Sequence, residues 1–227
     1  MSAKHFQEIL ASNAMFESLS REERKMIIET GSLVVYEKGE TISKQGALCA
    51  HANFIANGLC KMYLEGPYQR KLIIALVNKR TFIGLSKLYD TDRNLFSVAA
   101  LDDCNVLEIP KMTIRHLIEK NKEFAKRMIA DIARESNDFL AKLYSQNCKQ
   151  LHGRLSGTLL YMEHEIAKDS FIDLPVSRRD MADMAGIATE SAIRMLSELS
   201  HDGIITLEGK AIRVVREDLL QKLYEIG

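Results

Sequence analysis

The chain has 227 residues, of which 46% are hydrophobic and 27% charged, and its formal net charge is zero. This length suggests one large domain or two modest ones, and the apolar fraction is enough to bury a sizeable core. The neutral balance gives no overall basic signal for nucleic acid or for a membrane surface. No apolar run comes near the roughly 18 residues needed to span a bilayer, and residues 1–16 do not have the pattern of a signal peptide. We therefore expect a soluble cytoplasmic protein with no membrane partner.

The four cysteines, at positions 49, 60, 104 and 148, are widely separated and form no CxxC pair. None belongs to a Cys/His cluster with ligand spacing. This pattern is typical of small buried thiols, and a zinc or iron–sulfur site would require the fold to gather them. We expect no metal site and no cofactor.

The first forty residues predict helices, and in one of them Ser20 is the expected N-cap with Glu23 at the capping-box position. Between residues 31 and 110 the sequence changes to short β-rich runs separated by turn-forming pairs such as Asn57-Gly58. The predicted strands are Leu33–Tyr36, Phe54–Ala56, Lys61–Leu64, Leu72–Val77, Phe96–Ala100 and Cys104–Ile109. Strands of this length and spacing predict an antiparallel β-roll rather than βαβ units.

After Pro110 the apolar period becomes helical. Seven residues alternate four and three apart and form a heptad seam: Ala125, Ile129, Ile132, Ser136, Phe139, Leu143 and Gln146. A helix with one narrow apolar stripe, and charged residues such as Lys142 on its opposite face, either packs along the roll or pairs with its copy in a second chain. The strict seam, with small or polar residues at 125 and 136, favours a dimer. The polar stretch 147–150 is the predicted hinge, which gives expected domains at 1–146 and 147–227.

Two short helices joined by a tight turn are predicted in the last third of the chain. Ser177 is the expected N-cap of the first helix, Arg178–Ala185, and the turn Gly186–Ala188 leads into the second helix, Thr189–Leu199. Residues 204–207 and 211–215 then predict a β-hairpin around the turn 208–210. A hairpin directly after a helix-turn-helix is a wing, so the combination indicates a winged helix-turn-helix.

The start of the second helix is where a recognition helix meets base edges in the major groove of DNA. Arg194 can donate two hydrogen bonds to guanine O6 and N7, and Glu190 can accept one from cytosine N4. The two side chains are one helical turn apart, so they share a face and could orient each other. The candidate DNA-contacting residues are Ser177, Arg178, Arg179, Thr189, Glu190, Ser191, Arg194 and Lys210.

Residues 148–227 carry thirteen acidic and ten basic side chains, which is a net charge of −3. Attraction to phosphates must therefore come from the local placement of arginines and lysines and from helix N-termini. We expect modest nonspecific affinity for DNA with a modest salt dependence. The acidic balance also motivates an alternative, a ligand-sensing regulatory module that acts through a protein partner and not through DNA.

An enzymatic function is not expected, because the sequence has no Gly-rich phosphate loop, no HExxH motif and no nucleophile elbow. The one compact titratable cluster is Glu163-His164-Glu165. On a single helix its adjacent members face different directions, so we interpret it as part of a solvated surface.

The order of β-roll, long helix and winged helix-turn-helix resembles the CRP/FNR family of bacterial transcription regulators, over nearly the whole chain. In the roll, the resemblance rests on Lys38-Gly39-Glu40, Gln45-Gly46, Phe54-Ile55, Gly58 and Phe82-Ile83-Gly84. In the C-terminal part it rests more specifically on residues 177–182, 186, 189–191 and 194–196. The resemblance implies an α+β fold with an N-terminal antiparallel β-roll similar to a cyclic-nucleotide-binding jelly roll, a long dimerisation helix and a C-terminal winged helix-turn-helix. It also implies a homodimer on an inverted-repeat DNA site, an effector bound in the roll, and RNA polymerase as a candidate further partner.

The resemblance extends to individual residues unevenly. Glu190 and Arg194 match the two family positions that read a G·C pair in each half-site, whereas Thr189 stands where the cyclic-AMP-responsive members have an Arg. In the roll, Leu85 replaces the Glu that accepts from the ribose hydroxyl, and Phe96-Ser97 stands in place of the Arg-Ser pair for the cyclic phosphate.

A buried phosphate without a charge partner is costly, so cyclic AMP is not expected to bind in the usual way. The candidate effector pocket consists of Gly84, Leu85, Ser86, Phe96 and Ser97. Its composition predicts an uncharged or apolar effector, or none.

Overall fold

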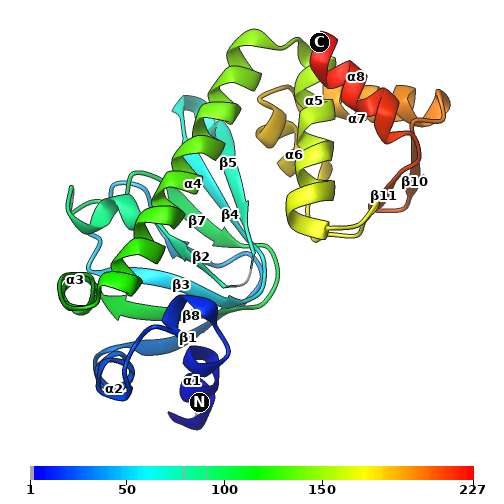
Figure 1. Ribbon diagram of the computed structural model, residues 1–227. Coiled ribbons are helices and arrows are strands. Elements are labelled where there is room, and N and C mark those ends of the chain that lie inside the picture. Colours follow the sequence, from blue (N-terminus) through cyan, green and yellow to red (C-terminus); the bar gives the residue numbers. More distant parts are fainter. Residues whose placement is uncertain (1–2, 79, 91) are drawn as a thin grey trace. The chain divides into compact units, whose positions relative to one another are not determined.

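The computed structural model describes residues 3–78, 80–90 and 92–227, which form two compact units. The first unit comprises Met1–Glu65 and Leu76–Asn137, and the second comprises Gly66–Ala75 and Asp138–Gly227. Figure 1 labels most of their helices and strands, numbered in chain order. Within the described ranges, no helix combines the length and the hydrophobicity that a membrane crossing requires. The predicted domain boundary between residues 146 and 147 stays a prediction.

The chain begins with two helices, α1 (Ala3–Ala11) and α2 (Arg21–Thr30), joined through a short 3₁₀ turn, η1 (Ala14–Phe16). The predicted capping box of α2 is confirmed. The Ser20 hydroxyl accepts from the Glu23 backbone N–H at 3.2 Å, and the Glu23 carboxylate accepts from the Ser20 backbone N–H at 2.8 Å. The reciprocal pair satisfies two backbone donors that the first turn of a helix otherwise leaves free.

Two four-stranded sheets form the β-roll. Their strands are β1 (Ser32–Tyr36), β2 (Thr41–Ser43), β3 (His51–Asn57), β4 (Cys60–Glu65), β5 (Lys71–Val77), β6 (Thr81–Ile83), β7 (Ser97–Ala100) and β8 (Cys104–Pro110). The strand orders are β1-β8-β3-β6 and β2-β7-β4-β5. Strand β8 pairs antiparallel with β1 and β3, and β7 pairs antiparallel with β2 and β4. The predicted antiparallel roll is thus confirmed, although the three-residue strands β2 and β6 are too short to show an alternating pattern in the sequence.

The core of the first unit is built around three aromatic rings. The ring centroids of Phe16, Phe54 and Phe82 lie 4.9 to 5.9 Å apart in edge-on arrangements. This geometry places the positive edge of one ring against the negative face of another, which adds to the gain from burying the rings. Phe124 and Met128, from the start of the long helix, belong to the same buried cluster. The cluster therefore joins the N-terminal turn, the roll and the long helix.

The long helix, α4 (Lys122–Cys148), follows α3 (Lys111–Lys120) and carries the whole predicted heptad seam in one uninterrupted element (Figure 1). Its first turn packs into the core, but the seam residues Ile129, Phe139 and Leu143 are 65%, 45% and 42% exposed. The stripe is therefore largely exposed at these three positions. The helix runs through Cys148, so the predicted hinge 147–150 begins inside it, and the break falls at residues 149–150.

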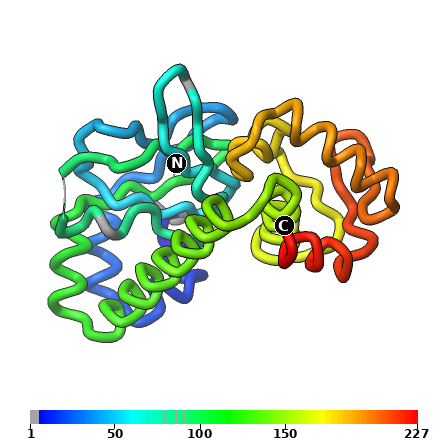
Figure 2. Tube along the Cα trace, turned by 90° about the horizontal axis from the view of Figure 1, so that it is seen from above, coloured from blue at the N-terminus to red at the C-terminus, as the bar shows by residue number. Residues whose placement is uncertain are grey.

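The C-terminal part contains α5 (Leu151–Tyr161), a π-helical segment η4 (Met162–Ala167), α6 (Arg178–Ala185), α7 (Thr189–His201) and α8 (Glu217–Ile226). A three-stranded sheet has the order β10-β11-β9, from β9 (Phe171–Ile172), β10 (Ile205–Glu208) and β11 (Ala211–Val214). The predicted winged helix-turn-helix is confirmed in its order of elements. Helix α8 is not among the predicted elements, and it lies beside α5 in both Figure 1 and Figure 2.

Lys142 departs from the expected solvent-facing side of α4. Its side chain is partly buried, and its Nζ donates to the backbone carbonyl of Met184 at the C-terminal end of α6. A cation at the C-terminus of a helix is favourable because free carbonyls give that end a partial negative charge. Burial nevertheless lowers the pKa of Lys142 to about 8. The contact ties the end of α4 to the first helix of the helix-turn-helix.

The cysteines are only in part the small buried thiols that the sequence predicts. Cys60 and Cys104 are buried with their sulfur atoms 3.4 Å apart, whereas Cys148 is exposed. The hydrogen bond with Cys104 and burial raise the pKa of Cys60. A thiol that stays protonated reacts slowly with electrophiles and binds metals poorly, so this pair has a packing role.

Candidate nucleic-acid interface

The first helix of the helix-turn-helix begins at the predicted cap. The Ser177 hydroxyl accepts from the Asp180 backbone N–H at 3.1 Å, and the Asp180 carboxylate accepts from the Ser177 backbone N–H at 3.0 Å. Asp180 is buried, so the capping box fixes the start of α6 within the packed domain. Ser177, one of the candidate DNA contacts, is therefore already engaged in holding this helix.

The turn between α6 and α7 depends on Gly186. Its φ of +65° lies in the left-handed region, which a glycine adopts without the strain that a Cβ would cause. Past this turn, α7 packs against α6 through small side chains, and both Ala182 and Ala192 are fully buried. Met195, Leu196 and Leu199 are buried as predicted, so the opposite face of α7 is left to carry the polar residues.

The exposed face at the start of α7 carries the predicted base-reading pair. Glu190 and Arg194 are exposed, whereas Thr189 and Ser191 are half-buried. Arg194 is not oriented by Glu190 as its spacing suggests, because its Nε lies 3.7 Å from a carboxylate oxygen of Glu198, one turn further along. Both positions are four residues from Arg194, so the sequence pattern alone could not distinguish them. An exposed pair of this kind contributes little energy, and DNA could displace it.

The wing is tied to α6 through Arg178. Its guanidinium donates to the carbonyl of Gly209 in the wing turn at 3.4 Å, and burial lowers the pKa of Arg178. Arg213 on β11 stacks over the ring of Phe171 on β9, with 4.6 Å between the guanidinium carbon and the ring centroid. The first contact joins the wing turn to α6, and the second joins β11 to β9 within the three-stranded sheet. Arg179 and Lys210 are exposed and free to meet a phosphate backbone.

The predicted effector pocket is described for four of its five residues, since the side chain of Ser86 lies outside the described part. Gly84 has a φ of +67° and begins a short 3₁₀ helix, η3 (Leu85–Leu88). Leu85 belongs to the apolar core cluster of the first unit. The hydroxyl of Ser97 donates to the Glu65 carboxylate at 2.8 Å. Leu85 and Ser97 thus already have partners within the roll.

A buried cation, Lys87, lies among these residues although it is not one of the predicted pocket members. Its ammonium is 4.2 Å from the centroid of the Phe96 ring and donates to Asn94 Oδ1 at 3.0 Å. Burial lowers the pKa of Lys87, and the aromatic face and the amide oxygen compensate part of the lost hydration. The expectation of an apolar pocket is therefore incomplete. The sequence gives little indication that Lys87 is buried, because a lysine between Ser86 and Leu88 looks like an ordinary surface residue.

The roll also contains a cavity of about 200 Å³ that none of the five predicted residues lines. Its wall includes Ser43, Asn53, Asn94 and Glu108. Within the described part of the chain, the Ser43 hydroxyl and the Asn53 carbonyl oxygen are buried without a hydrogen-bond partner. Buried polar groups are normally satisfied, so this wall is polar and could accommodate bound water.

A β-roll followed by a long helix and a winged helix-turn-helix defines a class of transcription regulators that bind DNA. Residues 33–121 match the family model of the cyclic nucleotide-binding domain, and residues 153–223 match that of the Crp-like helix-turn-helix domain. The chain belongs to the CRP/FNR family of transcription regulators.

Individual relatives agree with this assignment. The cAMP-activated global transcriptional regulator CRP of Escherichia coli is 24% identical over 183 residues, which cover 79% of this chain and 87% of the relative. The structure of FixK2 from Bradyrhizobium japonicum is similar with a TM-score of 0.78 at 22% identity, over 86% of this chain and 97% of that one. The c-di-GMP responsive global regulator CLP from Xanthomonas campestris has a TM-score of 0.72 at 18% identity, over 86% of this chain and 99% of that one.

Proposed function

We propose that this regulator binds an inverted-repeat DNA site as a homodimer and reads its sequence mainly through Glu190 and Arg194. The observation that carries the proposal is the exposure of these two side chains at the start of α7, on the face opposite the buried Ala192 and Leu196. A guanidinium and a carboxylate one helical turn apart match the donors and acceptors of a G·C pair in the major groove. Thr189 and Ser191 would contribute hydroxyls at the edge of the same face.

The remaining candidate residues suit contacts to the phosphate backbone, which position a protein without reading sequence. Arg179 at the start of α6 and Lys210 at the wing turn are exposed cations, one before and one after the recognition helix in the sequence. Arg178 would support this contact by holding the wing turn in place. Because the net charge of residues 148–227 is −3, we expect few phosphate contacts and a modest salt dependence.

The exposed seam of α4 supports a homodimer. Apolar side chains repeated at heptad spacing, with Ile129, Phe139 and Leu143 open to solvent, are typical of a helix that pairs with its copy. A two-fold dimer would place two recognition helices in successive major grooves, about 34 Å apart, which requires an inverted repeat. Function on DNA places the proposed site of action in the bacterial cytoplasm. RNA polymerase is a further proposed partner, which co-purification on promoter DNA would test.

Selection of bound sequences from random duplex DNA tests the proposal, using the purified full-length protein without added effector. We expect enrichment of an inverted repeat with a G·C pair at the matching place in each half-site. If no sequence is enriched, with or without metabolite extracts, and the protein instead co-purifies with one stable protein partner, the alternative of a module that acts on a protein would be preferred. The observation that supports this alternative is the net negative charge of residues 148–227.

We further propose that cyclic AMP is not the effector. Leu85 is packed in the apolar core where a ribose hydroxyl would need an acceptor, and Lys87 already has Asn94 and the Phe96 ring as partners. A ligand at a hundred times its Kd stabilises a protein by about 2.7 kcal/mol, which raises Tm by roughly 5 to 10 °C for a chain of this size. We expect no such rise with cyclic AMP or cyclic GMP in a thermal-shift measurement. Clear stabilisation by either nucleotide would overturn the proposal.

A further inference from the structure

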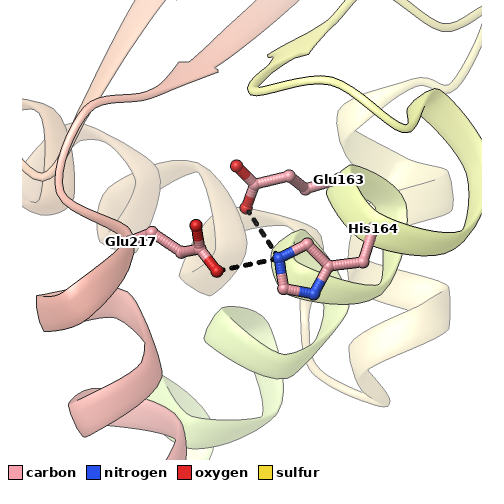
Figure 3. Close-up of side chains that lie close together, drawn as sticks. All are labelled: Glu163, His164 and Glu217. Carbon is pink, nitrogen blue, oxygen red and sulfur yellow. Dashed lines mark hydrogen bonds and ion pairs between the residues drawn. The ribbon is translucent and has the colours of Figure 1, made fainter.

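Three side chains that offer metal ligands meet where the π-helical segment η4 faces the start of α8. Figure 3 shows Glu163 and His164 from η4 and Glu217 from the first turn of α8 pointing toward one another. The His164 Nε2 atom lies 2.9 Å from a Glu217 oxygen and 3.9 Å from Glu163 Oε2. One ligand atom from each of the three lies within 4.8 Å of the other two. The cluster therefore differs from the solvated surface that the sequence predicts at residues 163–165.

Glu163 is the unusual member of the cluster. Its side chain is only 6% exposed, and within the described part of the chain its Oε2 atom accepts no hydrogen bond. Burial raises the pKa of Glu163, and the negative charge of Glu217 raises it further. The one positive charge that the cluster itself can supply is a protonated His164. A desolvated carboxylate that faces a second carboxylate across a histidine is a costly arrangement unless a cation joins it.

The π-helical turn explains how adjacent residues come to share one site. In a regular α-helix, positions 163 and 164 project in directions about 100° apart. The wider turn of Met162–Ala167 brings Glu163 inward while His164 stays exposed, and both reach Glu217.

We propose that Glu163, His164 and Glu217 bind one divalent transition-metal ion. With metal–ligand bonds of about 2.1 Å, a tetrahedral ion separates its ligand atoms by roughly 3.4 Å, and the observed 2.9 and 3.9 Å lie on either side of this value. The exposed side chains of His164 and Glu217 can move by the few tenths of an ångström needed to reach these separations, while Glu163 is held in place by burial. One imidazole and two carboxylates suit Zn²⁺, because Mg²⁺ and Ca²⁺ favour oxygen ligands alone.

Three protein ligands leave one coordination position for water. The ion would lie between His164 Nε2 and the two carboxylates and would compensate the buried charge of Glu163. Because η4 follows α5 and α8 packs against α5, the ion would link the C-terminal end of α5 to the start of α8 in the DNA-binding domain. We expect bound metal to stabilise this domain.

Titration calorimetry with ZnCl₂ on chelator-treated full-length protein tests the proposal. We expect one Zn²⁺ per chain, and an affinity at least tenfold weaker in both Glu163→Gln and Glu217→Gln. Glu217 is exposed, so the second variant retains the fold even if the first does not. Two matched controls should bind as the wild type does: Glu165→Gln, an exposed neighbour outside the cluster, and His152→Gln, which removes a surface histidine paired with one carboxylate, Glu198.

A spectroscopic measurement separates this site from the cysteines. Co²⁺ bound to one imidazole and two carboxylates gives no thiolate charge-transfer band, and the exposed Cys148 would give one. Binding that persists in both glutamine variants, or that is lost in Cys148→Ser, would overturn the proposal. So would a wild-type protein that binds no Zn²⁺ or Co²⁺.

Discussion

Replacing Arg194 with alanine is expected to abolish the preference of this protein for its own DNA site while leaving nonspecific binding nearly unchanged. Arg194 is exposed at the start of α7, and its guanidinium pairs with another exposed side chain, Glu198. Its removal should therefore cost the fold little. A two-donor contact to guanine contributes about 1 to 3 kcal/mol of discrimination, and a dimer makes it twice. We expect specific affinity to fall by about 30-fold to about 20,000-fold, measured by fluorescence anisotropy on the selected site.

Lys210→Ala is the matched control, since it also removes an exposed cation from the same domain. Lys210 lies in the wing turn between β10 and β11 and is not part of α7. Its loss should weaken selected and random DNA by the same factor and should lower the salt slope by about one per contact. Equal losses on both kinds of DNA in Arg194→Ala would mean that Arg194 contacts phosphate, and the reading role proposed for α7 would then be wrong.

The helix-turn-helix could be predicted from the sequence because its signals are local. A capping residue at 177 and a glycine at 186 mark the two ends of α6, and each acts through hydrogen bonds or a φ angle within a few residues. The predicted bounds of α6 agree with the structure, and α7 extends two residues beyond its predicted end. Packing across the domain only stabilises what these residues already specify.

The partners of charged side chains could not be predicted, because they depend on which elements meet in space. Lys87 has an unremarkable position in the sequence, and only the fold of the roll places its ammonium over Phe96. Glu163 is buried where α5 widens into the π-helical segment η4 and α8 packs nearby, and neither feature follows from the local sequence pattern. Lys142 follows the periodicity of a solvent-facing position, yet the carbonyl of Met184 lies within its reach. In each case a long-range contact decides the environment of a residue whose local pattern is ordinary.

The same distinction applies to the heptad seam of α4. Its periodicity predicts a helix and an apolar stripe, and both are present. Whether these apolar side chains become buried depends on other molecules as well as on this chain. The exposure of Ile129, Phe139 and Leu143 makes a second copy the simplest cover, because each seam residue then meets its own equivalent across a two-fold axis.

Phe139→Glu is accordingly expected to convert the proposed dimer to monomers. Burying a phenylalanine side chain contributes about 1.5 to 3 kcal/mol, and the two-fold axis doubles the effect of each substitution. The dimer dissociation constant should rise by about 10² to 10⁴-fold, before the repulsion between the two introduced carboxylates is added. Since Phe139 is 45% exposed within one chain, the monomer should stay folded. Sedimentation equilibrium measures the change in mass directly.

Ala141→Glu provides the control, because residue 141 lies on the side of α4 opposite the seam and is exposed. It introduces the same charge on the same helix and should leave the dimer intact. If Phe139→Glu remains dimeric, the seam is not the interface. If instead it becomes monomeric but retains full affinity for the inverted repeat, each half-site would be bound independently. The exposed α4 seam would then serve assembly without coupling the two recognition helices, whereas a joint loss of dimer and DNA affinity is expected if the dimer holds both helices at the spacing of one DNA turn.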